Sequence, residues 1–111
     1  MPDIQERHRK TILLIDDDQD MHTICRRYVE NAGYSFVSAY DGKHGLEIIS
    51  QGNADLVLLD FMMPEKDGYA VYKDLVTLEE FSHVRNVPVI MLSVLADRIP
   101  KKAELLSLGI S

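Results

Sequence analysis

The sequence has 111 residues, which is enough for one domain with one hydrophobic core. Its 18 acidic and 12 basic residues give a net charge of −6, which argues against a nucleic-acid-binding surface, because such a surface needs clustered lysine and arginine. No apolar run is long enough to cross a membrane, and the single cysteine, Cys25, permits no internal disulfide. We therefore expect a cytoplasmic domain over residues 11–111 after a polar tail over residues 1–10, with no nucleic-acid or membrane partner.

Short apolar runs alternate with longer segments of helical spacing. The apolar runs predict strands at Thr11–Ile15, 36–39, 55–60 and Val89–Leu92. Helical patterns begin at residue 18 or 19, near residue 46, near residue 69 and after residue 100. Residues 79–86 are polar and are interpreted as the end of the third helix plus a connection. The alternation predicts an α/β fold, a doubly wound parallel sheet with helices on both faces.

The same patterns predict which side chains face the core. On the first helix, the apolar side comprises Met21, Ile24, Cys25, Tyr28, Val29 and Ala32. Cys25 is interpreted as a small buried hydrophobe, and Tyr69 and Tyr72 on the third helix are placed in the core or at its edge. The four histidines show no zinc-ligand spacing and are predicted to be surface residues: His8, His22, His44 and His83.

Carboxylates follow two of the predicted strands. In ILLIDDDQD, residues 12–20, four aspartates occupy five positions directly after an apolar run, and Asp60 ends the third strand. Because ligands bind outside the carboxyl ends of parallel strands, Asp16, Asp17 and Asp60 are predicted to converge and hold Mg²⁺. Ser93, at the end of the fourth strand, adds a hydroxyl, and an ionised Asp60 can attack a phosphoryl group to form an acyl phosphate.

Two other readings of the acidic cluster are weaker. An EF-hand needs glycine and glutamate where this sequence has Met21 and Arg27. A phosphohydrolase of the haloacid-dehalogenase type needs glycine and then threonine or valine soon after its paired aspartates, and these residues are missing here. The domain is therefore not expected to be an enzyme.

Four blocks resemble the receiver domain of two-component response regulators. They are ILLIDDD (12–18), AYDGKHGLEII (39–49), LVLLDFMMPEKDG (56–68) and PVIMLS (88–93), in the order and at the intervals of that family. The resemblance covers residues 11–111 and implies the flavodoxin-like, CheY-like receiver fold. It also implies a phosphoacceptor role for Asp60, which would take its phosphoryl group from a histidine kinase or a histidine phosphotransfer protein.

The resemblance assigns further roles. Asp17 and Asp60 would bind Mg²⁺ directly, Asp16 would act through water, and Met62 would supply its backbone carbonyl to the metal. Ser93 would be the switch hydroxyl that bonds the phosphoryl oxygen. Pro64 and Gly68 would shape the loop beside the site.

The end of the sequence departs from the family pattern. The family continues past the region of Gly109 into a fifth strand, a lysine that pairs with the phosphoryl group and a fifth helix, whereas this sequence stops at Ser111. The fourth strand would then be an exposed apolar edge able to pair with a second copy. The alternative to phospho-acceptance is therefore a truncated receiver that acts as a dimerisation or docking module without productive phosphorylation.

Overall fold

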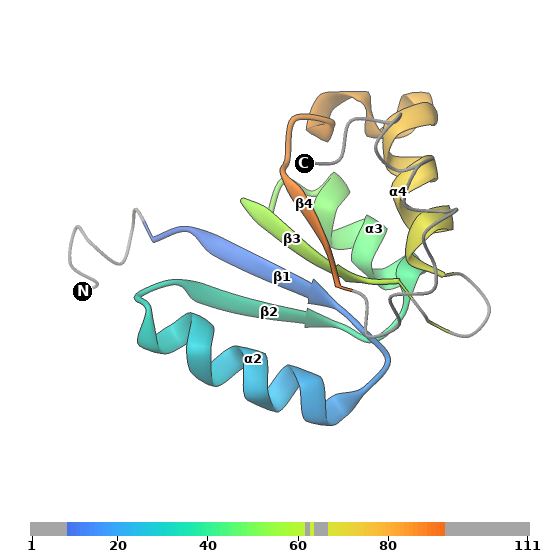
Figure 1. The fold of residues 1–111 in the computed structure, drawn as a ribbon. Helices are drawn as coiled ribbons and strands as arrows, with labels where there is room; N and C mark the ends of the chain where they lie inside the picture. The colour runs from blue at the N-terminus through green and yellow to red at the C-terminus, as the bar shows by residue number, and fades with distance from the viewer. Residues whose placement is uncertain (1–8, 62, 64–66, 93–111) are drawn as a thin grey trace.

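The computed structural model describes residues 9–61, 63 and 67–92 (Figure 1). Four strands and three α-helices alternate, and a 3₁₀ helix precedes the last strand. In chain order they are β1 (Thr11–Ile15), α2 (Gln19–Asn31), β2 (Ser35–Ala39), α3 (Gly42–Ser50), β3 (Leu56–Asp60), α4 (Gly68–Thr77), η1 (Glu79–Val84) and β4 (Val89–Leu92). The predicted fourth helix after Pro100 lies outside the described residues.

The strands form one parallel sheet in the order β2-β1-β3-β4. Ile15 at the end of β1 pairs with Ala39 of β2 on one side and with Leu59 of β3 on the other. This register aligns the carboxyl ends of the three strands at one edge of the sheet. The α/β prediction with a parallel sheet is confirmed.

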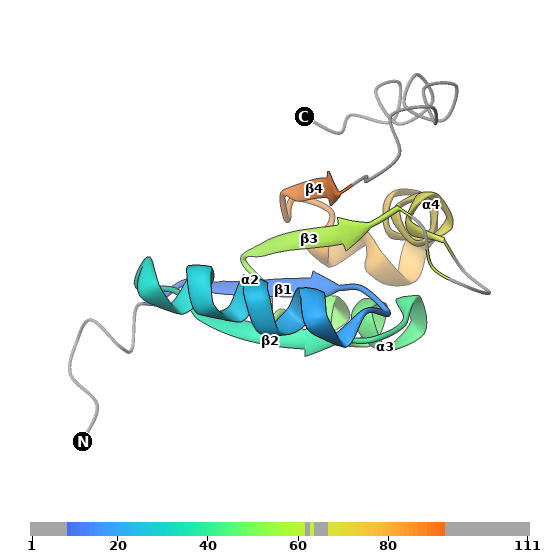
Figure 2. The same cartoon turned by 60° about the horizontal axis from the view of Figure 1, so that its bottom comes forward.

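Helices cover both faces of the sheet, with α2 on one side and α3 and α4 on the other (Figures 1 and 2). Alternate residues of β1 serve the two sides, because successive strand side chains point to opposite faces. Leu13 and Ile15 pack toward α3 and α4, and Ile12 and Leu14 pack toward α2. Within the described residues, no helix combines the length and apolar character needed to cross a membrane.

The predicted apolar face of α2 is partly wrong. Val29 is buried and Cys25 is partly buried, but Ile24 is 53% exposed and Tyr28 is 73% exposed. The residues that face the sheet are Met21, His22, Cys25 and Val29, at spacing i, i+1, i+4 and i+8, which is one narrow stripe of a helix. Ile24 and Tyr28 lie around the helix from that stripe, so apolar spacing alone selected the wrong face for them.

The segment after α4 also differs from its prediction. Residues Glu79–Val84 form the 3₁₀ helix η1, and Phe81 within it is buried in the main core. Tyr72 is buried in that core and Tyr69 packs against it, which confirms the placement of both tyrosines. Two apolar side chains in a polar segment, the buried Phe81 and the partly buried Val84, therefore anchor η1 to the core beside α3 and α4.

Candidate functional site

Three carboxylates meet at the carboxyl edge of the sheet. Asp16 and Asp17 follow β1 directly, and Asp60 is the last residue of the neighbouring strand β3. Each offers one carboxylate oxygen, and these oxygens all lie within 4.8 Å of one another. Oxygens on opposite sides of an octahedral Mg²⁺ are roughly 4.2 Å apart, since each metal–oxygen bond is about 2.1 Å. Three carboxylate oxygens this close can therefore hold a Mg²⁺ ion, directly or through bound water.

Asp16 is the buried member of the group, with 5% of its surface exposed. Its backbone N–H donates to the Ala39 carbonyl at 3.1 Å, and its Oδ1 accepts from the Asp18 N–H at 2.8 Å. Burial raises the pKa of the Asp16 carboxyl above its ordinary value, and the charge of Asp17 acts in the same direction. The hydrogen bond from Asp18 lowers it, but burial has the larger effect. A divalent cation would relieve this unfavourable electrostatic environment.

The acidic run divides into site residues and helix-capping residues. Asp18 is the N-cap of α2 and accepts from the Asp20 N–H at 2.9 Å. Asp20 lies in the first turn, where the helix dipole favours a negative charge. These two carboxylates have local structural roles, as their positions predict.

Gly68 packs against the backbone of Asp60. Its N–H donates to the Phe61 carbonyl at 3.1 Å, and a Cβ built at this position would overlap the Asp60 carbonyl oxygen. Asp67, directly before it, caps α4 by accepting from the Ala70 N–H at 2.9 Å. The start of α4 is therefore fixed against the end of β3, beside the Asp60 side chain.

His22 is buried, with 3% exposure, so its prediction as a surface residue is wrong. Its Nε2 lies 2.7 Å from the Asp16 carbonyl oxygen, and its Nδ1 lies 2.8 Å from the Ser38 hydroxyl. His44 and His83 are exposed, as predicted, and His8 lies outside the described residues. The available sequence signal was the position of His22 on the same helical stripe as Cys25 and Val29.

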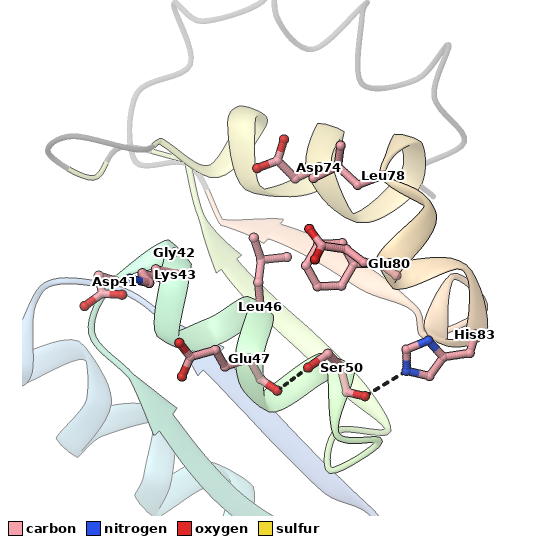
Figure 3. A pocket seen from close by; sticks show the side chains of 11 residues that line it. Asp41, Gly42, Lys43, Leu46, Glu47, Ser50, Asp74, Leu78, Glu80 and His83 are labelled. Carbon is pink, nitrogen blue, oxygen red and sulfur yellow. Dashed lines mark hydrogen bonds between the residues drawn. The ribbon is translucent and has the colours of Figure 1, made fainter.

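A pocket of about 860 Å³ lies elsewhere, between α3, α4 and η1 (Figure 3). Leu46 and Phe81 supply buried apolar side chains to it. Its polar lining consists of Asp41, Lys43, Glu47, Ser50, Asp74, Glu80 and His83. Because carboxylates outnumber the one lysine, this pocket is unsuited to an anionic phosphoryl donor. It also contains none of the three clustered aspartates.

The family model for the response regulator receiver domain matches residues 12–111. The chain belongs to this family. The receiver assignment and the flavodoxin-like, CheY-like fold expected from the sequence are thereby confirmed. Among the described residues the receiver fold is represented by its first four strands.

Similar proteins agree with the assignment. The probable transcriptional regulator ycf27 of Porphyridium aerugineum is 37% identical over 89 residues, covering 80% of this chain and 35% of that protein. The receiver domain of the Francisella response regulator 1452 is 33% identical, with a TM-score of 0.76 over 93% of this chain and 80% of that one. This chain spans about a third of the length of the curated relatives that it matches, for example 35% of each ycf27 protein.

One structural neighbour was solved with ligands. The receiver domain of the histidine kinase CKI1 from Arabidopsis thaliana, in complex with Mg²⁺ and BeF₃⁻, has a TM-score of 0.80 and covers 96% of this chain and 80% of that one. Its sequence identity is 21%, so the likeness shows the fold alone.

The predicted site residues divide into two groups. The structure brings Asp16, Asp17 and Asp60 together. Ser93 and Met62 lie outside the described residues, so their assigned roles stay predictions. Pro64 in the loop after β3 is likewise outside them.

Proposed function

We propose that this receiver domain, residues 11–111 after the tail of residues 1–10, accepts a phosphoryl group on Asp60 in the presence of Mg²⁺. The proposed donor is the phosphohistidine of a histidine kinase or histidine phosphotransfer protein, in a cytoplasmic two-component pathway. The observation that carries the proposal is the approach of three carboxylate oxygens within 4.8 Å at the ends of β1 and β3. Like charges so close together favour a site whose ligand is a cation.

The chemistry suits the residues. A carboxylate oxygen of Asp60 attacks phosphorus, an O–P bond forms, and the P–N bond to the donor imidazole breaks. The ionised carboxylate needs no general base, and the leaving imidazole nitrogen takes a proton. Mg²⁺, when bound, neutralises charge on the phosphoryl oxygens and on the aspartates. The phosphoryl group stays on the chain, so the domain acts as an acceptor and not as an enzyme that turns over its donor.

The individual metal ligands are part of the proposal. Asp17 and Asp60 would bind Mg²⁺ directly, and the buried Asp16 would act through a water molecule. The backbone carbonyl of Met62 would complete the protein ligands, and the Ser93 hydroxyl would donate to a phosphoryl oxygen. The closeness of Asp16, Asp17 and Asp60 supports the first part of this scheme.

Intact-mass spectrometry after incubation with acetyl phosphate tests the proposal. We expect the mass to rise by one phosphoryl group only when Mg²⁺ is present, and we expect no rise in Asp60→Asn. A matched control is Asp55→Asn, at the opposite end of β3, where asparagine can still accept the Thr11 N–H bond that Asp55 accepts at 2.8 Å. An adduct that forms equally in Asp60→Asn, or a folded wild-type protein that forms none, would contradict the proposal.

A second candidate is a docking module that pairs through β4. Among the described strands β4 is one of the two edge strands, and its Ile90 is 44% exposed. An apolar outer strand can pair with a second copy of the chain. Light scattering of wild type and Ile90→Lys tests this candidate: a dimer that dissociates in the variant supports it, and a monomeric wild type contradicts it.

A further inference from the structure

His22 connects the acidic end of β1 to the neighbouring strand β2. Its ring is buried, and both ring nitrogens have partners: the Asp16 carbonyl for Nε2 and the Ser38 hydroxyl for Nδ1. Asp16 lies 6 positions before His22 in the sequence, and Ser38 lies 16 positions after it. A buried histidine bound at both nitrogens is held in one orientation.

The partners determine which nitrogen carries the proton. A backbone carbonyl oxygen can only accept, so Nε2 must donate to Asp16. Nδ1 of a neutral ring then accepts from the Ser38 hydroxyl, which can donate or accept as required. The bond to Asp16 is thus defined by chemistry, and the bond to Ser38 adjusts to it.

Three alternate residues of the chain hold the ring from one side of the sheet. The ring centroid lies 4.2 Å from that of Tyr40, and it meets Phe36 edge-on at 6.2 Å. Phe36 and Ser38 are two residues apart in β2, so they project from the same face of the strand, and Tyr40 directly follows β2. This arrangement fixes the ring relative to β2, the strand that also accepts the Asp16 N–H at Ala39.

The Asp16 carbonyl belongs to the peptide unit that links the first two clustered aspartates. A peptide unit is planar and rigid, so the direction of its carbonyl sets the orientation of the chain on both sides of it. The Nε2–H bond at 2.7 Å therefore controls how the side chains of Asp16 and Asp17 leave the backbone. We propose that His22 is a positioning residue that holds the Asp16–Asp17 peptide in the orientation that binds Mg²⁺. This inference rests on the proposed function.

Two variants separate the two bonds. In His22→Gln, the longer side chain places an amide N–H near the position of Nε2 and can keep the bond to Asp16. In His22→Asn, the shorter side chain can keep the bond to Ser38 but does not reach Asp16. Leu75→Ala, in the core on the opposite face of the sheet, controls for a general loss of stability.

The measurement is the Mg²⁺ dissociation constant of each full chain by titration calorimetry, at a temperature where circular dichroism shows it folded. We expect Mg²⁺ binding to be roughly tenfold weaker in His22→Asn, the usual effect of removing a group that orients a metal ligand. His22→Gln should retain most of the affinity, and Leu75→Ala should retain all of it. Wild-type affinity in His22→Asn would overturn the inference. A folded wild type that binds no Mg²⁺ would refute the proposed function, and this inference with it.

A spectroscopic test on the wild type covers the case in which His22→Asn does not fold. Nitrogen NMR of the ring should show a proton on Nε2, and saturating Mg²⁺ should shift that signal. A ring protonated only on Nδ1 would overturn the inference. The inference would also be overturned if Mg²⁺ shifted the signal of the Asp17 amide but left the Nε2 signal unchanged.

Discussion

Replacing Gly68 with alanine should destabilise the domain, although alanine is normally the better residue in a helix. Gly68 is the first residue of α4, and its Cα faces the backbone of Asp60. An added Cβ would overlap the Asp60 carbonyl oxygen and would lie 3.0 Å from the Asp60 carbonyl carbon and 3.0 Å from Met91 Cε. Carbon atoms in contact prefer about 3.5–4.0 Å, so one of the neighbours has to move.

The neighbours differ in how easily they move. The Met91 methyl is the end of a flexible side chain and can rotate away. The Asp60 backbone belongs to β3, pairs with Leu92 of β4, and is followed by the Phe61 N–H bond to the Leu92 carbonyl at 3.0 Å. We therefore expect an overpacking penalty near about 3 kcal/mol, the upper end of the usual range. Alanine recovers about 1 kcal/mol of helix propensity, which leaves a net loss of about 2 kcal/mol.

Urea denaturation followed by circular dichroism measures the effect. For a domain of this size, a loss of about 2 kcal/mol corresponds to a fall in Tm of roughly 8–16 °C in a thermal melt. The displaced Asp60 backbone should also weaken Mg²⁺ binding. Gly52→Ala is the control: Gly52 has φ of +77° and nothing within 4 Å of an added Cβ. It should lose about 1 kcal/mol through backbone strain alone and keep its Mg²⁺ affinity. A Gly68→Ala midpoint at or above that of wild type would refute the reasoning.

Three other substitutions test the site and the core. Burial raises the pKa of the Asp16 carboxyl in the folded protein above 3.8, its ordinary value. As pH rises, the folded protein therefore keeps the carboxyl proton longer than the unfolded chain does. The contribution of Asp16 to stability is full below pH 3.8 and falls as the pH rises to neutral. Asp16→Asn should therefore be more stable than wild type at pH 7 without Mg²⁺ and should lose this pH dependence, because its Oδ1 can still accept the Asp18 N–H bond. Urea midpoints at several pH values measure this difference. A variant less stable than wild type at pH 7 would contradict the prediction. Ile24→Ala should change the free energy of unfolding by less than about 0.5 kcal/mol, whereas Ile49→Ala, at a site 2% exposed, should lose about 2–5 kcal/mol. Equal losses from the two isoleucines would show that their exposures in the structure are wrong.

The strands could be predicted because each is a short, mainly apolar run with a clear end. The third strand was predicted from residue 55 and begins at Leu56; Asp55 still bonds Thr11 of β1, through its backbone N–H and through its side chain. Helical periodicity was less decisive. On α2 it suggested a wide apolar face, while the sheet takes a narrow stripe and leaves Ile24 and Tyr28 exposed. Several faces of α2 are almost equally apolar in sequence, and packing against the sheet determines which of them is buried.

The acidic site was predictable to a similar degree. Asp16, Asp17 and Asp60 lie at strand ends, which implied that they converge once the sheet was taken as parallel. The closeness of their oxygens in the structure follows from that register. The role of His22 behind the carboxylates was not predictable, because it depends on a contact between α2 and β2. His22 resembles a surface residue in the sequence, and only the position of Ser38 opposite it shows that its ring is bound at both ends.

The carboxylate cluster opposes the stability of the fold that produces it. The same parallel register that buries Ile15 and Leu59 completely or nearly so also places their successors, Asp16 and Asp60, beside each other with like charge. Local compensation is limited, since the Asp18 N–H bond to Asp16 does not reverse the effect of burial on the Asp16 pKa. A cation bound only by the folded chain adds stability in proportion to the logarithm of its concentration, about 2.7 kcal/mol at one hundred times its Kd. Relief of this repulsion thus adds to the binding energy, so a substitution that stabilises the metal-free domain by removing one of these charges, such as Asp16→Asn, should weaken Mg²⁺ binding.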